Sequence, residues 1–130
     1  MTKLSMKTTI LGREMSLPFG IAPTAMHKLV HKEGEKLVAR VALEKNICLT
    51  ISNLATVKIG DIAKENKSGL RLMQLYVLKN RGYTEALIKL AEQHGYGGLV
   101  VTVDAQLFGK RIMDVKNGFS SDGVELEIWS

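Results

Sequence analysis

The chain of 130 residues contains one cysteine, two prolines and few aromatic residues, 5% of the total. The single cysteine, Cys48, excludes an intramolecular disulfide and fits a reducing compartment. Because Cys48 lies in an apolar strand-like segment, we predict an inert core residue rather than a reactive thiol. No apolar run approaches the roughly 18 residues of a membrane span, and no apolar signal segment follows the basic start. We therefore expect an intracellular protein without a membrane partner.

The net charge of +5 is spread over 18 Lys and Arg residues rather than gathered in one stripe. Aromatic residues do not alternate with these charges, so we expect a solvated basic surface and no nucleic-acid partner. The segment from His27 to His31 (HKLVH) has Lys28 where a zinc protease motif needs Glu, so we expect no metal site. Glycine-rich phosphate loops of the G-x-G-x-x-G or G-x-x-x-x-G-K-[ST] type are also lacking.

Apolar, strand-like segments alternate with helical patterns along the chain. Strands begin near residues 19, 47, 71 and 98, which is the period of successive strand–helix units that form a parallel sheet. Asn46 and Gly95 are suitable helix stops because both residue types tolerate a left-handed backbone. The predicted strands are 18–24, 47–52, 70–77 and 98–104, and the predicted helices are 33–46, 57–66 and 84–94.

Polar residues end every one of these strands: Thr24, Ser52, Gln74 with Tyr76, and Thr102 with Asp104. A doubly wound sheet gathers its site at one switch point and usually carries a glycine-rich loop after its first strand. An even distribution over consecutive strands instead favours an α/β fold of the TIM-type (β/α)8 barrel class. Such a barrel typically needs about 250 residues, so we expect a half-barrel fragment that holds about the first four strands.

The strand-end residues have both functional and ordinary interpretations. Thr102 and Asp104 are two residues apart, so they point to the same side of a strand, but an Asp can also simply cap a loop. A Gln such as Gln74 inside a barrel needs a hydrogen-bonding partner, which a polar cofactor would provide. Arg111 beside a strand end suits a carboxylate substrate, although the pair Lys110–Arg111 can also be solvated.

The order and spacing of five motifs identify a family resemblance. The chain resembles the FMN-dependent 2-hydroxy-acid oxidases and dehydrogenases, particularly the branch of glycolate oxidase and the (S)-2-hydroxy-acid oxidases. The resemblance covers residues 8–119, while residues 120–130 form a tail without a usable motif. The motifs are residues 21–26 (IAPTAM), 52–56 (SNLAT), 74–76 (QLY), 101–104 (VTVD) with 109–111 (GKR), and 114–119 (DVKNGF).

The resemblance implies FMN as cofactor and oxidation of a small (S)-2-hydroxy acid to the 2-oxo acid. It implies that Asp104 stabilises the protonated form of a catalytic histidine, and that Arg111 helps to hold the substrate carboxylate. Tyr76 is implied to contact both flavin and substrate. The other implied flavin contacts are the backbone of Pro23, Thr24 and Ala25, which wraps the ring, and the hydrogen-bonding side chains of Ser52, Gln74 and Thr102.

The chain departs from the family pattern, because it lacks motifs that family members carry in the second half of their sequence. The H-x-x-R motif that carries the family's catalytic histidine is absent, and His27, His31 and His94 match no part of it. Leu54 stands where many members have Trp, which puts glycolate specificity in doubt. We therefore predict a single partial FMN domain over residues 1–130 that is truncated and inactive alone.

Several alternatives remain open from the sequence. The chain could belong to another FMN barrel, such as a type 2 isopentenyl-diphosphate isomerase, or form a non-catalytic half-barrel binding or assembly module. A homo-oligomer is possible, and an isolated half-barrel is expected to self-associate through its exposed strand edges. The compartment is open between peroxisome and cytoplasm, because the end of the chain (EIWS) is not the S-K-L signal.

Overall fold

The computed structural model describes residues 4–107 and 109–129. Its main sheet is parallel with the strand order β3-β4-β5-β6, so the predicted parallel sheet of successive strand–helix units is confirmed. A two-stranded antiparallel hairpin, β1-β2, precedes this sheet. The elements are β1 (Thr8–Ile10), β2 (Arg13–Met15), β3 (Gly20–Ile21), a 3₁₀ turn (His27–Leu29), α1 (Glu35–Glu44), β4 (Cys48–Ile51), α2 (Ile59–Glu65), β5 (Arg71–Tyr76), α3 (Arg81–Gln93), β6 (Gly98–Thr102) and α4 (Ile112–Asn117).

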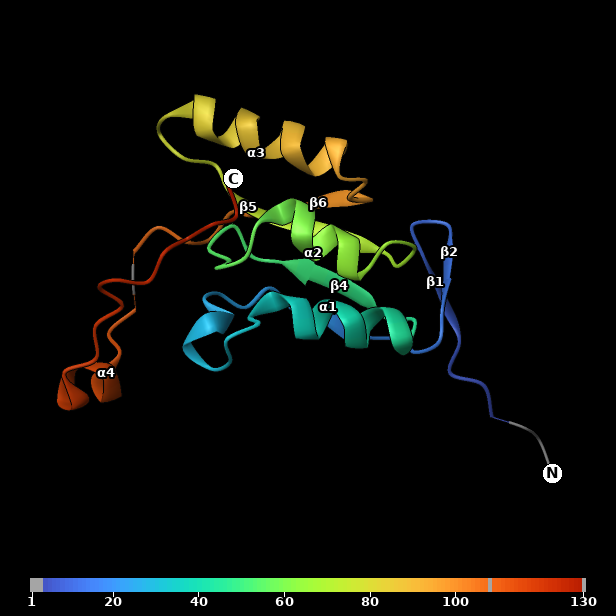
Figure 1. Ribbon diagram of the computed structural model, residues 1–130, viewed down its shortest axis with the longest axis horizontal. Coiled ribbons are helices and arrows are strands. Elements are labelled where there is room, and N and C mark those ends of the chain that lie inside the picture. Colours follow the sequence, from blue (N-terminus) through green and yellow to red (C-terminus); the bar gives the residue numbers. More distant parts are fainter. Residues whose placement is uncertain (1–3, 108, 130) are drawn as a thin grey trace.

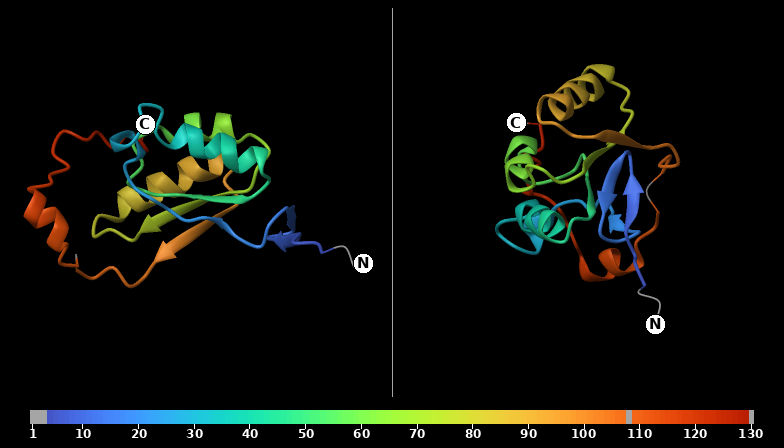
Figure 2. Two further views of the ribbon diagram at one scale, coloured as in Figure 1. Left: turned by 90° about the horizontal axis from the view of Figure 1, so that it is seen from below. Right: turned by 90° about the vertical axis from the view of Figure 1, so that its right-hand side faces the viewer.

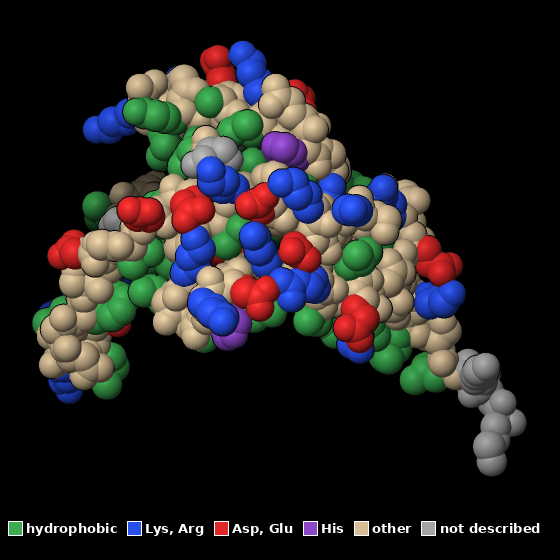
Figure 3. Space-filling view, viewed as in Figure 1, with side chains coloured by type: hydrophobic (Ala, Val, Ile, Leu, Met, Phe, Trp, Pro, Cys, Tyr) green, Lys and Arg blue, Asp and Glu red, His purple; other side chains and the backbone are tan. Residues whose placement is uncertain are grey.

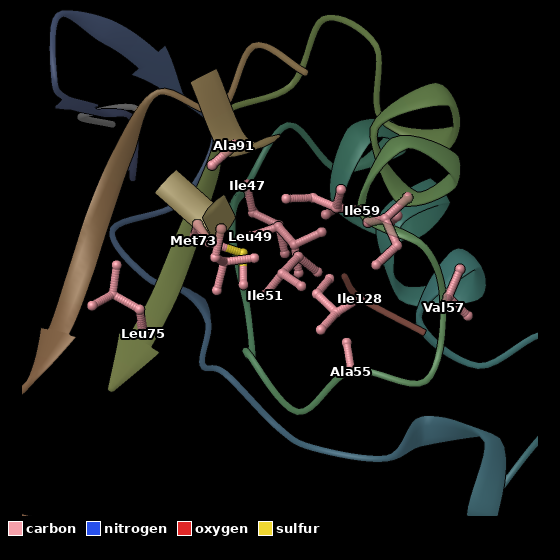
Figure 4. Close-up of a cluster of buried hydrophobic side chains, with 14 residues drawn as sticks. Ile47, Leu49, Ile51, Ala55, Val57, Ile59, Met73, Leu75, Ala91 and Ile128 are labelled. Carbon is pink, nitrogen blue, oxygen red and sulfur yellow. The ribbon is translucent and has the colours of Figure 1, made fainter. Parts of the chain in front are cut away.

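Helices α1, α2 and α3 cover one face of the sheet (Figures 1 and 2). The core lies between these two layers, where alternate residues of each strand point toward the helices. Burial of this apolar surface is the main stabilising contribution to such a fold. The core residues include Leu49 and Ile51 of β4, Met73 and Leu75 of β5, Leu87 and Ala91 of α3, and Ile59 and Ile62 of α2 (Figure 4).

The opposite face of the sheet is closed at one end by the β1-β2 hairpin, which the sequence did not reveal. Met15 of this hairpin is buried against Cys48 and Leu70, near the amino ends of β4 and β5. Cys48 is thus a core residue, as predicted, and its burial raises the pKa of its thiol. The tight turn of the hairpin has positive φ at Leu11 and Gly12, whereas Asn-Gly or Asp-Gly is the usual sequence signal for such a turn.

The helix ends follow the sequence signals. Asn46 has φ 48° and Gly95 has φ 69°, so both adopt the left-handed conformation that was predicted to end the helices. The helix predicted from residue 84 begins earlier, at Arg81, because the Asn80 side chain accepts a hydrogen bond from the Gly82 N–H at 3.0 Å. Val41, within α1, is 47% exposed, so it does not belong to the buried face of this helix.

The first predicted strand is much shorter than expected. Residues 18–24 were predicted as a strand, but β3 contains only Gly20 and Ile21. Pro18 and Pro23 flank it and have no N–H to donate to a neighbouring strand. At Gly20 the backbone approaches β4 so closely that a Cβ would lie 2.7 Å from the Cys48 carbonyl oxygen.

The C-terminal segment leaves the sheet and then returns to it. Helix α4 lies apart from the other helices, beyond the end of the sheet toward which the strands point (Figures 1 and 2). The tail then brings Ile128 into the core, where it is fully buried with Ile51 and Ala55 (Figure 4). Trp129 packs edge-to-face on Tyr83 of α3, with 6.1 Å between the ring centroids. The tail without a motif is therefore part of the packed structure.

Acidic and basic side chains lie side by side on the surface shown in Figure 3. Arg40 pairs with both Glu33 and Glu65, and Lys64 pairs with Asp61 at 2.8 Å. Much of the basic charge is thus locally balanced over α1 and α2. Within residues 4–107 and 109–129, no helix is both long and apolar enough to cross a membrane.

Candidate active site

One glutamine joins the carboxyl ends of three neighbouring strands. Gln74 of β5 is 3% exposed, and its Oε1 accepts a hydrogen bond from the Asn53 N–H at 3.1 Å. Its Nε2 donates to Oγ1 of Thr102, at the end of β6, at 3.0 Å. Asn53 directly follows Ser52 at the end of β4. This network from Asn53 through Gln74 to Thr102 fixes the direction of the amide and of the Thr102 hydroxyl.

The network leaves hydrogen-bond donors available. The Oγ of Ser52 accepts from the Leu54 N–H at 3.1 Å, and Oγ1 of Thr102 accepts from Gln74. Within the described part of the chain, the two hydroxyl protons and the second Nε2 proton of Gln74 have no assigned acceptor. Donors of this kind suit the carbonyl oxygens and ring nitrogens of a flavin, so the residues present fit FMN.

The strand register places the candidate residues on one face. Tyr76 is paired with Thr102 in the register, and Gln74 with Val100. Because Met73 and Leu75 point into the helix-covered core, Gln74 and Tyr76 point to the other face. Tyr76 is half-buried there. The structure therefore brings Ser52, Gln74, Tyr76 and Thr102 to the carboxyl-terminal end of the sheet, the end where parallel barrels carry their active sites.

The first strand–helix loop approaches the same end. Pro23 and Thr24 are exposed and Ala25 is half-buried. Immediately afterwards, the Met26 N–H donates to the Leu54 carbonyl oxygen at 3.1 Å. This bond fastens the loop of residues 22–34 to the loop that follows Ser52, so the Pro23–Ala25 segment lies near the second strand end.

Asp104 and Arg111 are not joined to the network. Strand β6 ends at Thr102, so the strand alternation expected to align Asp104 with Thr102 does not extend to Asp104, which is exposed. Arg111 is also exposed and lies 3.9 Å from Asp114 Oδ2 at the start of α4. Neither residue has a hydrogen bond to Gln74 or Thr102 among the described residues. Their predicted roles in catalysis and substrate binding stay predictions.

None of the three histidines is hydrogen-bonded to the network in the part of the chain that the structure describes. His94 follows α3, at the amino-terminal end of the sheet, and its ring lies against Gly60. His31 is exposed, and its Nδ1 accepts from the Glu33 N–H at 3.2 Å. His27 is held through its backbone N–H by Glu35. Across residues 4–107 and 109–129, no cluster of three or more His, Cys, Asp or Glu side chains has the arrangement of a metal site.

Sequence reasoning missed several buried polar residues near this end. Glu35 and Thr56 are almost completely buried and hydrogen-bonded to each other. Asn53 contributes its backbone N–H to the network. Glu35 opens a helix, where a negative charge is favourable, and this was the one sequence signal that could have drawn attention to it.

Known proteins match nearly the whole chain. The model of the FMN-dependent dehydrogenase family matches residues 1–127. A glycolate oxidase of Spinacia oleracea is 42% identical over 118 residues, which cover 91% of this chain and 32% of that protein. A 2-hydroxyacid oxidase of Dictyostelium discoideum is 39% identical over 129 residues, covering 98% of this chain and 33% of that protein. The chain thus spans about a third of the length of these relatives.

Solved structures agree with these matches. Mandelate oxidase with (S)-2-phenylpropionate aligns with a TM-score of 0.90 and 33% identity over 99% of this chain and 38% of that chain. A mandelate oxidase mutant with a C4a-OH-FMN adduct aligns with a TM-score of 0.88 and 34% identity, over 95% of this chain and 37% of that chain. The α/β fold is therefore confirmed as the first four strands of a TIM-type barrel. With flavin-suited donors at the strand ends and a family match over residues 1–127, the chain belongs to the FMN-dependent dehydrogenase family.

Proposed function

We propose that this chain supplies flavin-contacting strands for the FMN-dependent oxidation of a small (S)-2-hydroxy acid to the 2-oxo acid. The hydrogen-bond network from Asn53 through Gln74 to Thr102 carries this proposal. A hydrogen-bonded polar network at strand ends is rigid, and it presents its remaining donors in fixed directions. When bound, FMN supplies the acceptor for the two electrons that the hydroxy acid loses.

The residues of this chain would bind and orient the ring. Ser52, Gln74 and Thr102 would donate hydrogen bonds to flavin oxygen or nitrogen acceptors, and the backbone of Pro23–Ala25 would lie along the ring. Tyr76, half-buried on the same face, is the residue here that could reach both flavin and substrate. Arg111 would attract the substrate carboxylate by a charge-assisted hydrogen bond.

Oxidation of the hydroxy acid also requires a general base for the hydroxyl proton. His27, His31 and His94 have no hydrogen bond to the strand-end network in the described residues. We propose that the base comes from outside these 130 residues and that Asp104 supports it there. The chain by itself is accordingly expected to be inactive.

The names of the relatives support a 2-hydroxy acid as the substrate class, and the cellular compartment of this chain is a separate proposal. The matched proteins named above are glycolate, 2-hydroxyacid and mandelate oxidases, and none of them is an isomerase. A further relative, 41% identical over 116 residues, which cover 89% of this chain and 31% of that protein, is a peroxisomal (S)-2-hydroxy-acid oxidase of Oryza sativa. We place this chain in the peroxisome or the cytoplasm, and fractionation of its source cells distinguishes the two.

A fusion protein tests the proposal. In this fusion, the chain replaces the matching third of the glycolate oxidase of Spinacia oleracea (spinach). A 2-hydroxy acid is added in the absence of oxygen, and the bleaching of the bound flavin is then followed. We expect a yellow protein whose bound flavin bleaches. The Gln74→Leu variant is expected to lose most of the bound FMN, because it removes the amide that bonds to both Asn53 and Thr102. Gln93→Leu, an exposed glutamine at the end of α3, is the matched control. A colourless fusion, or a Gln74→Leu variant equal to Gln93→Leu, would contradict the proposal.

A further inference from the structure

Glu35, at the start of α1, is the most deeply buried charged side chain in the described residues, with 1% exposed. Its Oε1 accepts hydrogen bonds from the backbone N–H groups of His27 and Thr56, both at 3.1 Å. Its Oε2 accepts from the Thr56 hydroxyl at 3.0 Å. No Lys or Arg in residues 4–107 and 109–129 forms an ion pair with it. A buried carboxylate without a cation is costly unless such donors surround it, so Glu35 and these donors hold one another in place.

The donors come from two different loops. His27 lies in the loop that follows β3, and Thr56 lies in the loop that follows β4. The Thr56 Oγ1 also accepts from the Lys28 N–H at 3.1 Å. One carboxylate and one hydroxyl therefore fasten the first strand–helix loop to the second, directly after Ala25.

The backbone between Ala25 and His27 needs this support. Met26 has φ 58°, a left-handed conformation that residues other than glycine rarely adopt. Such a conformation persists where the surrounding structure holds it. Pro23 and Thr24 are exposed, and within residues 4–107 and 109–129 the Thr24 hydroxyl donates only to the Ala22 carbonyl, at 3.5 Å. The position of Pro23–Ala25 therefore depends on the anchored residues that follow.

We propose that Glu35 is a positioning residue, whose carboxylate holds the Pro23–Ala25 backbone beside Ser52 and the Gln74–Thr102 pair. The identification of FMN as the ligand beside these residues rests on the proposed function above. Among the described residues, Glu35 has no hydrogen bond to the network or to Pro23–Ala25, so it acts through His27 and Thr56. The role differs from ordinary helix capping because its partners lie in two separate loops.

Three variants separate positioning from general stability. Glu35→Ala removes every acceptor, whereas Glu35→Gln keeps Oε1 for the two N–H groups and can donate from its amide to Thr56 Oγ1. Asn66→Ala is the matched control, because Asn66 is fully buried and donates to the Ala39 carbonyl at 2.9 Å, at the other end of the sheet. It removes a buried hydrogen bond without touching either loop.

Hydrogen–deuterium exchange of the full chain, followed by mass spectrometry, gives the first readout. In peptides covering 22–30 and 52–58, we expect Glu35→Ala to exchange about tenfold faster than Asn66→Ala, because several charge-assisted hydrogen bonds are lost. Glu35→Gln is expected to stay near the wild type. Equal exchange in these peptides for Glu35→Ala and Asn66→Ala would overturn the proposal.

The FMN dissociation constant of the spinach fusion gives the second readout. We expect it to rise about tenfold in Glu35→Ala and to change little in Glu35→Gln and Asn66→Ala. A rise of equal size in Glu35→Ala and Asn66→Ala would overturn the positioning role. A wild-type fusion that binds no FMN would instead contradict the proposed function, and the exchange comparison would still decide the role of Glu35.

Discussion

Replacement of Ile128 by Ala tests whether the C-terminal tail is part of the core. Ile128 is fully buried among Ile51, Ala55 and Ile59, so the change removes apolar contacts and leaves a cavity. Comparable large-to-small substitutions cost about 2–5 kcal/mol. Against a typical total stability of about 5–15 kcal/mol, this loss is a large fraction. The expected result is a marked fall of the urea midpoint, with an unchanged slope if the change affects stability alone.

Far-UV circular dichroism and the fluorescence of Trp129, the only tryptophan, follow this unfolding. Because Trp129 packs edge-to-face on Tyr83, its emission also reports whether the tail stays docked. The matched control is Ile112→Ala on α4, where the side chain is exposed and a change within about 0.5 kcal/mol is expected. Equal urea midpoints for the two variants would refute the placement of the tail in the core.

Three further outcomes are expected. The isolated chain self-associates, because Leu99 and Val101 on the edge strand β6 are 43% and 45% exposed and an uncharged edge strand can pair with another chain. Sedimentation velocity should show weaker self-association for Val101→Lys. A wild-type chain that is monomeric and unfolds in one cooperative thermal transition would contradict this prediction. The purified chain does not retain FMN through gel filtration, and flavin absorbance at one equivalent per chain would show otherwise. Burial raises the pKa of Tyr96, whose hydroxyl donates to the Ile59 carbonyl. The unfolded chain then loses this proton first, so stability falls as the pH rises above about 10; Tyr96→Phe should reduce that fall, and identical alkaline profiles would contradict the assignment.

The sheet could be predicted because its signals are local. Apolar runs, polar strand ends and the helix stops at Asn46 and Gly95 all lie within a few residues of the features they specify. The hairpin β1-β2 has strands of three residues and a Leu-Gly turn, so neither alternation nor turn chemistry marks it. Burial of Ile128 depends on a core built by residues far earlier in the chain, which no local pattern reveals.

The candidate site shows the same division between local and long-range signals. The spacing of Gln74 and Tyr76 places both on one face of a strand, so their shared direction follows from the sequence. The hydrogen-bond partners of Gln74 do not follow from the sequence, because Asn53 and Thr102 are 21 and 28 residues away along the chain. Their meeting depends on the register of β5 between its two neighbours, and a slip by one residue would turn Gln74 into the apolar core. A buried glutamine with no partner would be costly there, so the network is also a physical reason for this register.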